Sequence, residues 1–288
     1  MADELSPAVG RRRLGAALRA HRLAAGRTLV DVAEHLACSA GKISRLEAAL
    51  VAPNVSDVRV LLDLYGVPGT ARESLLAVAR RSRDRAWWND YSDVLPADSA
   101  TFFGLEDGAA LIQEYSGGLV PGLLQVPEYA RALMECAPGV DPATVARRID
   151  LRLRRQRLLA RSEPPRLHVV LDEAVLVDTV GGPAGAARQL ACLVEAVEQH
   201  SITIQLLPTG SGAHPSKGGR FSILRFPDPA DRHIVYLEHD RSNTFLDGPK
   251  DLDHYSDAFA VIADLARSPG ESEQLLKAAS TNRLGATS

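Results

Sequence analysis

Over the first 85 residues, apolar side chains recur at helical spacing within short segments that end at turn residues. Leu14 and Leu18 lie one helical turn apart, and Gly26 can end their helix in the left-handed conformation. The run LVDVAEHL predicts a second helix, for which Thr28 is the expected N-cap. The run AGKISRLEAAL predicts a third helix, with Ser39 in the capping position. Three short helices are therefore expected in close succession.

Two more helices are expected before the pattern changes. One begins near Ser56, and the other covers about residues 70–85. Residues 1–10 carry no periodic apolar pattern, and we expect them to form a disordered leader. The periodicity thus predicts an all-α, five-helix domain over residues 11–85.

Later in the chain, short apolar runs bounded by turn residues alternate with helical patterns. The segments LHVVLD, ITIQLLP, RFSILRF, IVYLEH and NTFLDG are typical of strands. The helices expected among them cover about residues 127–136, 142–162, 184–200, 251–268 and 271–279. The stretch around LIQEYS is predicted as either helix or extended chain. The chain is therefore expected to be multidomain, with an α+β domain over 86–280 that holds a small, mainly antiparallel sheet, and a frayed tail over 281–288.

The second and third expected helices have the layout of a helix-turn-helix. Two helices that cross closely need a small residue at the contact, and Ala33 stands there. Ile43 and Leu46 can hold the third helix against the rest of the domain. Such a motif places the amino-terminal, solvent-facing residues of its second helix in the major groove of double-stranded DNA. The residues expected to contact DNA are Thr28, Ser39, Ala40, Gly41, Lys42, Ser44 and Arg45.

These residues offer different contacts to a duplex. The amides at the helix starts after Thr28 and Ser39 suit phosphate oxygens. Lys42 and Arg45 can reach phosphates or guanine edges, and Ser44 can bond to either. The small Ala40 and Gly41 allow only close approach or contact with a thymine methyl. Phosphate contacts and DNA shape are therefore expected to carry part of the specificity.

Charge divides the chain in the same place as the pattern does. The whole chain has a net charge of −3, which by itself argues against a nucleic-acid binder. Residues 1–85, however, carry a net charge of +5, and residues 86–288 carry −8. A basic piece joined to an acidic piece suggests that only the first binds a polyanion. The alternative is a helical bundle that serves only for protein interaction.

The stretch LGAALRAHRLAAGRTLVDVAEHLACSAGKISRLEAA resembles the Xre family of repressor-type helix-turn-helix proteins. The resemblance implies an ion pair between Arg22 and Glu47, which would tie the first helix to the end of the recognition helix. Three residues depart from the family pattern. Leu29 stands where the family usually has Gln, and Ala37 and Ala48 stand where it usually has Gly.

The rest of the chain resembles a large actinomycete group of Xre-type regulators. The resemblance rests on WWNDYSDVLP, LIQEYSGGLVPGLLQVPEYARAL, LDEAVL, VGGPAGAARQL, ITIQLLP, GAHPSKGGRFSILRFPDP and IVYLEH, in that order. The carboxy-terminal domain of that group has no assigned function and is classed as toxin–antitoxin-like. The resemblance implies transcriptional control and a small acidic partner protein encoded nearby. An alternative function is an antitoxin-like protein that sequesters a small partner and regulates its own synthesis.

The carboxy-terminal part shows no catalytic motif and no expected cofactor. It has no G-x-S-x-G elbow and no H-E-x-x-H, so we expect no enzyme. His233, His239 and Asp240 are spaced too widely for a metal site, so we expect no metal. The loop between two expected strands is polar and rich in glycine, and is a candidate for contact with a small-molecule effector or partner. Its candidate residues are His214, Ser216, Lys217 and Arg220. A plain solvated hairpin loop is the alternative.

Three aromatic residues and one arginine-rich helix have open roles. Trp87 and Trp88, with Tyr91, either line a pocket or cement an interdomain contact. The arginine run over 147–161 either extends the DNA footprint or forms a solvated or dimer face. A homodimer is expected because one such module buries little surface on DNA. The chain lacks an apolar run long enough to span a membrane, and the expected location is the cytoplasm, on the nucleoid when DNA is bound.

Overall fold

The computed structural model describes residues 6–82, 86–95, 99–217, 219–239 and 242–286. The chain divides into two compact units. The first comprises residues 1–90, 100–108 and 228–231, and the second comprises 91–99, 109–227 and 232–288.

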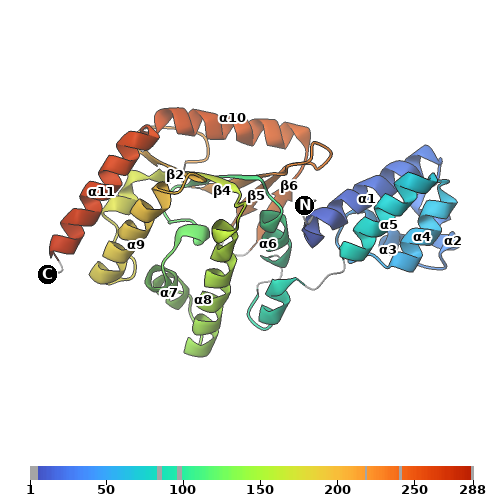
Figure 1. The fold of residues 1–288 in the computed structure, drawn as a ribbon, viewed down its shortest axis with the longest axis horizontal. Coiled ribbons are helices and arrows are strands. Elements are labelled where there is room, and N and C mark those ends of the chain that lie inside the picture. The colour runs from blue at the N-terminus through green and yellow to red at the C-terminus, as the bar shows by residue number, and fades with distance from the viewer. Residues whose placement is uncertain (1–5, 83–85, 96–98, 218, 240–241, 287–288) are drawn as a thin grey trace. The chain divides into compact units, whose positions relative to one another are not determined.

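The first unit contains the helix-turn-helix region, and its helical character is confirmed. Its successive helices are α1 (Pro7–Ala24), α2 (Leu29–His35), α3 (Ala40–Glu47), α4 (Val55–Leu64) and α5 (Gly69–Arg81) (Figure 1). One face of each amphipathic helix enters a common core. The fully buried members of that core include Leu14, Leu18, Val32, Val58 and Leu62.

The first helix begins earlier than the sequence pattern indicates. It starts at Pro7 rather than Arg11, and Ala8 and Val9 are buried. Proline is well suited to the first helical position, where its missing N–H leaves no bond unmade. Residues 7–10 therefore form helix rather than a leader, while the expectation for residues 1–5 lies outside the described residues, as do residues 83–85 at the far end of the predicted domain.

The described part of the second unit contains a six-stranded mixed sheet, so the prediction of a small, mainly antiparallel sheet was wrong. The strands lie in the order β3-β2-β1-β4-β5-β6. Parallel pairing joins β1 to β2 and β2 to β3, and antiparallel pairing joins β1 to β4, β4 to β5 and β5 to β6. The strands are β1 (Leu111–Ser116), β2 (Arg166–Asp172), β3 (Ile202–Leu207), β4 (Arg220–Arg225), β5 (Ile234–Glu238) and β6 (Asn243–Leu246).

The connections explain the two halves of the sheet. Helices separate β1, β2 and β3, and a helical crossover brings the chain back in the same direction. Short loops separate β4, β5 and β6, which therefore run antiparallel. The sequence pattern left the LIQEYS segment undecided between helix and extended chain. That segment is β1, the strand on which the parallel and antiparallel halves meet.

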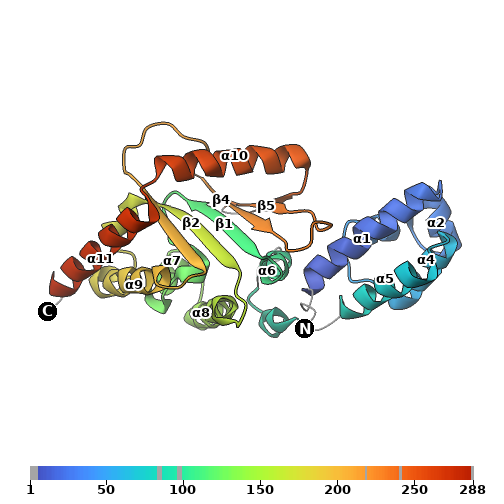
Figure 2. The same ribbon diagram turned by 45° about the horizontal axis from the view of Figure 1, so that its top comes forward.

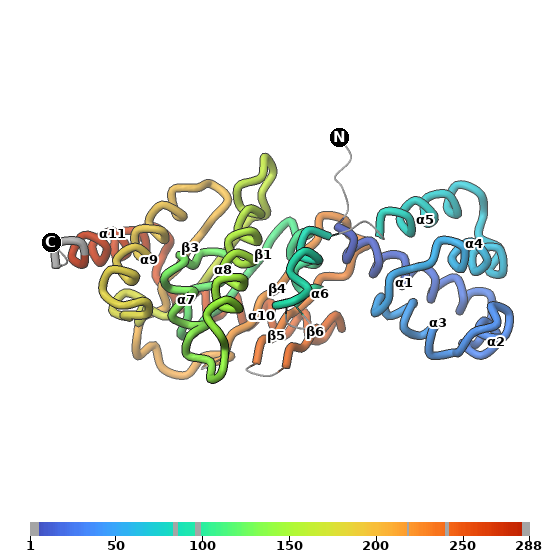
Figure 3. Tube along the Cα trace, turned by 90° about the horizontal axis from the view of Figure 1, so that it is seen from below, coloured from blue at the N-terminus to red at the C-terminus, as the bar shows by residue number. Residues whose placement is uncertain are grey.

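Helices cover both faces of the sheet. Helix α10 (Pro249–Leu265) lies across one face, while α7 (Pro127–Glu135), α8 (Pro142–Gln156) and α9 (Gly182–Val197) lie on the other (Figures 1 and 2). The view from below shows α7, α8 and α9 in front of the strands (Figure 3). Under α10, side chains of the sheet and the helix form one core, which includes Tyr115, Val170, Phe221, Phe259 and Ile262.

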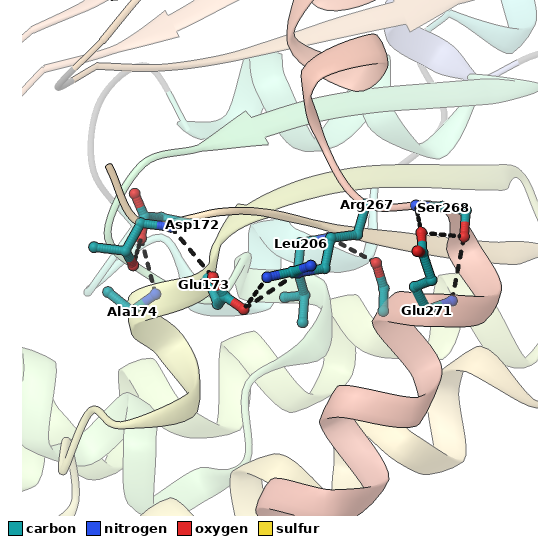
Figure 4. A network of polar contacts seen from close by, with 9 residues as sticks. Asp172, Glu173, Ala174, Leu206, Arg267, Ser268 and Glu271 are labelled. Atoms are coloured by element: carbon teal, nitrogen blue, oxygen red, sulfur yellow. Dashed lines mark hydrogen bonds and ion pairs between the residues drawn. The ribbon is translucent and has the colours of Figure 1, made fainter. Parts of the chain in front are cut away.

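The segment that follows α10 covers part of the β3 edge of the sheet. The Arg267 amide donates to the Leu206 carbonyl oxygen at 2.9 Å, and the Arg267 guanidinium lies 3.2 Å from a carboxylate oxygen of Glu173 (Figure 4). Just beyond, the Glu271 carboxylate accepts from the amide and hydroxyl of Ser268. An edge strand with unpaired backbone groups invites association, and this segment covers part of that edge.

The carboxy-terminal helix extends further than expected. Helix α11 covers Pro269–Ala286 and packs beside α9. Residues 281–286 of the predicted frayed tail are therefore helical, while 287–288 lie outside the described residues. The remaining described helical segments are α6 (Ser99–Asp107) and the 3-10 turns η1 (Trp87–Tyr91), η2 (Gly122–Leu124), η3 (Arg157–Ala160) and η4 (Glu173–Leu176). Within the described residues, none of the helices is long and apolar enough to cross a membrane.

Candidate functional site

The recognition helix α3 has one face in the core and one face in solvent. Ile43 and Leu46 are buried in the core of the first unit, as are Val32 and Ala33 of α2. The small side chain of Ala33 thus lies where the two helices pack. The remaining predicted contact residues on α3 are exposed, except that Ala40 is half-buried against the core.

The turn between α2 and α3 contains a residue under local strain. Ala37 has a φ of 49°, in the left-handed region that favours glycine. After α3, the left-handed residue is Ala49, with a φ of 58°, whereas Ala48 has a φ of −81°. The resemblance placed glycine at positions 37 and 48, and the structure shows that the conformational need falls at 37 and 49.

A glycine on α1 allows the close approach of α1 to the end of α3, a feature that the sequence reasoning missed. A Cβ atom added at Gly15 would lie 2.5 Å from the carbonyl oxygen of Glu47 and 2.9 Å from that of Leu46. Any larger side chain would push the two helices apart. The signal available in the sequence was a glycine inside an otherwise regular helical pattern.

The structure contains the ion pair between Arg22 and Glu47. The Nε and Nη2 atoms of Arg22 donate to the two carboxylate oxygens of Glu47 at 2.7 and 2.9 Å. The two side chains are only 9% and 7% exposed. Arg22 also donates to the carbonyl oxygen of Arg27 at 2.9 Å. This bidentate, buried pair fixes α1 to the carboxy-terminal end of the recognition helix.

Tyr65 lies beside this ion pair. Its hydroxyl is buried and has no hydrogen-bond partner among the described residues. Burial, reinforced by the nearby Glu47 carboxylate, raises the pKa of Tyr65 to about 12. The phenol is therefore held neutral, and its polar atom is unsatisfied.

The amino-terminal ends of α2 and α3 differ in whether a carboxylate already occupies the place where a phosphate could bind. At α2, the Thr28 hydroxyl accepts from the Asp31 amide, and the Asp31 carboxylate accepts from the Thr28 amide at 2.8 Å. That capping box places a negative charge where the sequence reasoning expected a phosphate. At α3, the Ser39 hydroxyl accepts from the Lys42 amide at 3.2 Å, and no carboxylate takes part in the cap.

The exposed lysine of the recognition helix is held by a residue of α4. Lys42 Nζ lies 2.6 Å from a carboxylate oxygen of Asp57, and the two side chains are 45% and 22% exposed. The hydrogen bond to Asp57 raises the pKa of Lys42 above its ordinary value. Ser44 and Arg45 stand exposed on the same helix. The helix therefore presents Ser39, Gly41, Lys42, Ser44 and Arg45 to solvent, with Lys42 partly neutralised.

The second unit contains an open cleft of about 940 Å³ at the carboxyl end of β1. Three of the four predicted loop residues, Ser216, Lys217 and Arg220, line it. The fourth, His214, packs edge-on against Tyr115, with ring centroids 5.6 Å apart. The described residues that line it are Ser116, Gly117, Gly118, Leu119, Ser216, Lys217, Gly219, Arg220, Phe221, Leu237, Glu238, His239, Ser242 and Tyr255.

Trp87 and Trp88 are not among the residues that line this cleft. Trp87 stacks on Phe103 of α6 with ring centroids 6.0 Å apart, and Trp88 is buried. The two indoles meet edge-on at 5.5 Å. All three aromatic residues belong to the first unit, where they pack α6 in place.

Several arginines of α8 make contacts inside the second unit. The Arg147 guanidinium lies 4.3 Å from the Tyr91 ring centroid and 3.4 Å from a carboxylate oxygen of Asp93. Arg152 donates to the side-chain oxygen of Gln125. These contacts give part of the arginine run a packing role that the sequence reasoning did not consider.

The histidines considered for a metal make other contacts in the structure. His233 Nδ1 accepts from the Phe226 amide at 3.2 Å, and His239 lines the cleft. Asp240 lies outside the described residues. Among the residues that are described, no three or more His, Cys, Asp or Glu side chains are grouped so as to hold a metal ion.

Two protein-family models match the chain. Residues 13–75 match a family described as a helix-turn-helix domain, which suggests a DNA-binding regulator. Residues 99–278 match a family described as a domain of unknown function, DUF5753. No curated protein and no solved structure matches the chain. Because the second match spans more than half of the sequence, the chain belongs to the DUF5753 family and carries a helix-turn-helix domain ahead of that domain.

Proposed function

We propose that this protein is a sequence-specific regulator of transcription of the Xre type, which binds operator DNA through α3. The observation that carries the proposal is the two-sided recognition helix. Its inner face is fixed by Ile43, Leu46 and the buried Arg22–Glu47 pair, and its outer face presents Lys42, Ser44 and Arg45. A rigidly held helix with exposed cationic and hydroxyl groups is the arrangement that reads the major groove.

The division of contacts follows from the cap geometry. Ser39 and the start of α3 suit a phosphate, because no carboxylate occupies that helix end. Thr28 is less suited, because its amide is bonded to Asp31. Arg45 is the residue that we assign to base contact, and Lys42 to phosphate contact after release from Asp57.

The DUF5753 domain is proposed to receive the signal that changes DNA binding, either from a small molecule or from a partner protein. The function includes no catalytic step and no cofactor. The protein acts as a homodimer, because two half-sites are needed to bury enough surface for tight operator binding. The proposed location is the cytoplasm. The antitoxin-like function, in which a small acidic partner is sequestered, is the competing proposal.

Selection of binding sites from a random duplex DNA library by the full-length protein tests the proposal. The expected result is a short enriched motif with two related half-sites about 34 Å apart or a multiple of that distance. Failure to enrich any motif would contradict sequence-specific binding. A light-scattering mass equal to one chain on the enriched duplex would contradict the dimer.

The antitoxin-like function predicts a different effect of the partner protein on DNA binding. In that case, the product of an adjacent small gene forms a stable complex with this chain, and that complex binds the enriched duplex more tightly than the chain alone. A regulator that is released by its partner instead loses DNA binding in the complex. The same titration with and without the purified partner separates the two.

A further inference from the structure

The cleft of the second unit lies at the point where the sheet changes from parallel to antiparallel. β1 pairs with β2 in parallel and with β4 antiparallel, and the cleft opens beyond the end of β1 at Ser116. Loops that diverge at such a point leave a crevice in which open sheets commonly bind ligands. The crevice here combines four separate segments of chain, including Tyr255 of α10.

The two loops that form the cleft approach each other closely. A Cβ added at Gly117 would lie 3.0 Å from the Tyr115 hydroxyl and 3.3 Å from the Gly219 carbonyl oxygen. Ser216, near the end of the opposite loop that joins β3 to β4, has a φ of 58°. A non-glycine residue held in that region costs about 1 kcal/mol or more and is often found where a ligand binds.

The charge of the cleft is more favourable to an anion than to a cation. Among the described residues of its lining, Glu238 supplies the one carboxylate, which lies 2.5 Å from Arg220 Nη2. Lys217 adds a positive charge, and its Nζ donates to the Gly212 carbonyl oxygen at 2.6 Å, which uses one of three ammonium donors. A bound cation would have to compete with Arg220 for Glu238, whereas a bound anion meets Lys217 directly.

Part of the remaining wall of the cleft is apolar. Phe221 is buried beneath it, and Leu119, Leu237 and Tyr255 are only half-buried. Tyr255 packs on Phe221 with ring centroids 5.0 Å apart. An aliphatic or aromatic ligand body can therefore cover these side chains while its charged group reaches the loop that carries Lys217.

We propose that this cleft binds a small organic acid, whose anionic group bonds to Lys217 and Arg220 and whose apolar body covers Leu119, Leu237 and Tyr255. A carboxylate and a phosphate monoester share the required chemistry. The ligand assignment rests on the cleft alone, and its role as the regulatory signal rests in addition on the proposed function.

Calorimetric titration of the full-length protein with four probes of equal chain length tests the ligand class. The probes are sodium octanoate, octyl phosphate, octylammonium and 1-octanol. The expected result is saturable binding of octanoate or octyl phosphate, with affinities about tenfold or more above those of the other two, since a charge-assisted hydrogen bond is at stake. Preference for octanoate over octyl phosphate, or the reverse, identifies the anionic group. Equal binding of octylammonium, or no binding of either anion, would overturn the proposal.

Two matched pairs of variants locate the site. Lys217→Gln removes a charge from the cleft, and Lys250→Gln removes one from the exposed start of α10, outside the lining. Gly118→Trp places a large side chain in the cleft lining, at a position where a Cβ meets nothing within 4 Å, and Gly270→Trp adds the same side chain at an equally open position on α11. Gly118→Trp is expected to abolish anion binding and Lys217→Gln to weaken it about tenfold, with both controls unchanged.

The thermal melting curve of each variant shows whether it is folded. A folded Gly118→Trp variant that binds the anion normally would overturn the proposal. DNA binding is measured on the same samples with the selected duplex. If the anion binds but no duplex is enriched by the protein, the ligand site stands and the regulatory function fails. If the protein binds the duplex but no anion, the regulatory function stands and the ligand site fails.

Discussion

The recognition helix has an ion pair at each end, and the two have nearly equal lengths but very different surroundings. Near the start of α3, Lys42 Nζ lies 2.6 Å from Asp57, and both side chains are partly exposed. At its end, Glu47 meets Arg22 at 2.7 Å, and both side chains are buried. The exposed pair contributes little to stability because water and salt screen it. The buried pair cannot lose one partner without leaving an uncompensated charge in the core.

This difference assigns the two pairs different tasks. The buried pair fixes the position of α3, and the exposed pair holds a lysine that DNA can take over. When a phosphate replaces Asp57 as the partner of Lys42, a charge-assisted bond to the phosphate forms and the bond between Lys42 and Asp57 breaks. The affinity for DNA should therefore depend on Asp57, and the stability of the domain should depend on Glu47.

The largest expected effect is the loss of the buried pair. Glu47→Gln leaves the Arg22 guanidinium buried without its anion, which should lower the free energy of unfolding by about 3 kcal/mol. Urea unfolding followed by circular dichroism measures it. Asp57→Asn is the matched control and should change stability by about 0.5 kcal/mol or less. Equal losses in the two variants would contradict the comparison.

Tyr65 gives a second way to test the buried end, through pH. The pKa of its phenol is raised to about 12 in the folded chain from an ordinary value of 10. As the pH rises, the unfolded chain therefore releases this proton before the folded chain does. The contribution of the neutral phenol to the free energy of unfolding is complete below pH 10 and is lost as the pH rises toward 12. Tyr65→Phe should remove this part of the alkaline loss.

The same substitution also removes an unsatisfied hydroxyl. At pH 7, the free energy of unfolding of Tyr65→Phe should therefore be no lower than that of the parent, and up to about 1 kcal/mol higher. Unfolding measured at pH 7 and at several pH values between 10 and 12 tests both expectations. A clear loss of stability at pH 7 would show that the hydroxyl has a partner after all.

The turn between α2 and α3 should be improved by glycine. Ala37→Gly relieves a left-handed alanine and should raise the free energy of unfolding by about 1 kcal/mol. Ala48→Gly is the control, since Ala48 has an ordinary negative φ and glycine there only adds freedom to the unfolded chain. Gains in both variants, or in neither, would contradict the assignment of the strain to position 37.

The smallest effect concerns the exposed pair. Asp57→Asn frees Lys42 and should tighten operator binding about threefold. Asp63→Asn is the matched control, because it removes the same charge from the same helix while its ion-pair partner is Arg72. Anisotropy titrations of both variants at one salt concentration compare them. If the two variants bind alike, Lys42 does not contact the DNA.

A feature of the helix-turn-helix domain could be predicted from the sequence when the residues that form it lie close together along the chain. The helix starts at Thr28 and Ser39 could be predicted because capping is local. The pairing of Arg22 with Glu47 followed from the family resemblance. The role of Gly15 could not be predicted, because it depends on the crossing of α1 with the end of α3. The left-handed conformation of Ala49, rather than Ala48, is a difference of one residue that only the structure resolves.

The sheet and the cleft show where sequence reasoning reaches its limit. LIQEYS mixes polar and apolar residues without a clear period, and its neighbours are set by helical crossovers. Once β1 is a central strand, the sheet is mixed rather than mainly antiparallel. The loop residues Ser216, Lys217 and Arg220 could be picked out by composition. Their meeting with Leu119 and Tyr255 could not, because those segments lie far apart in the sequence.

The most direct test of the central claim is the salt dependence of operator binding with Lys42 and Arg45 both changed to alanine. We expect a folded protein that binds the selected duplex at least tenfold more weakly, with a slope of log K against log salt reduced by about two. The control changes Arg72 and Arg80 of α5 to alanine, which removes the same charge from another helix. Affinity and slope equal to those of the control would contradict the assignment of α3 as the recognition helix.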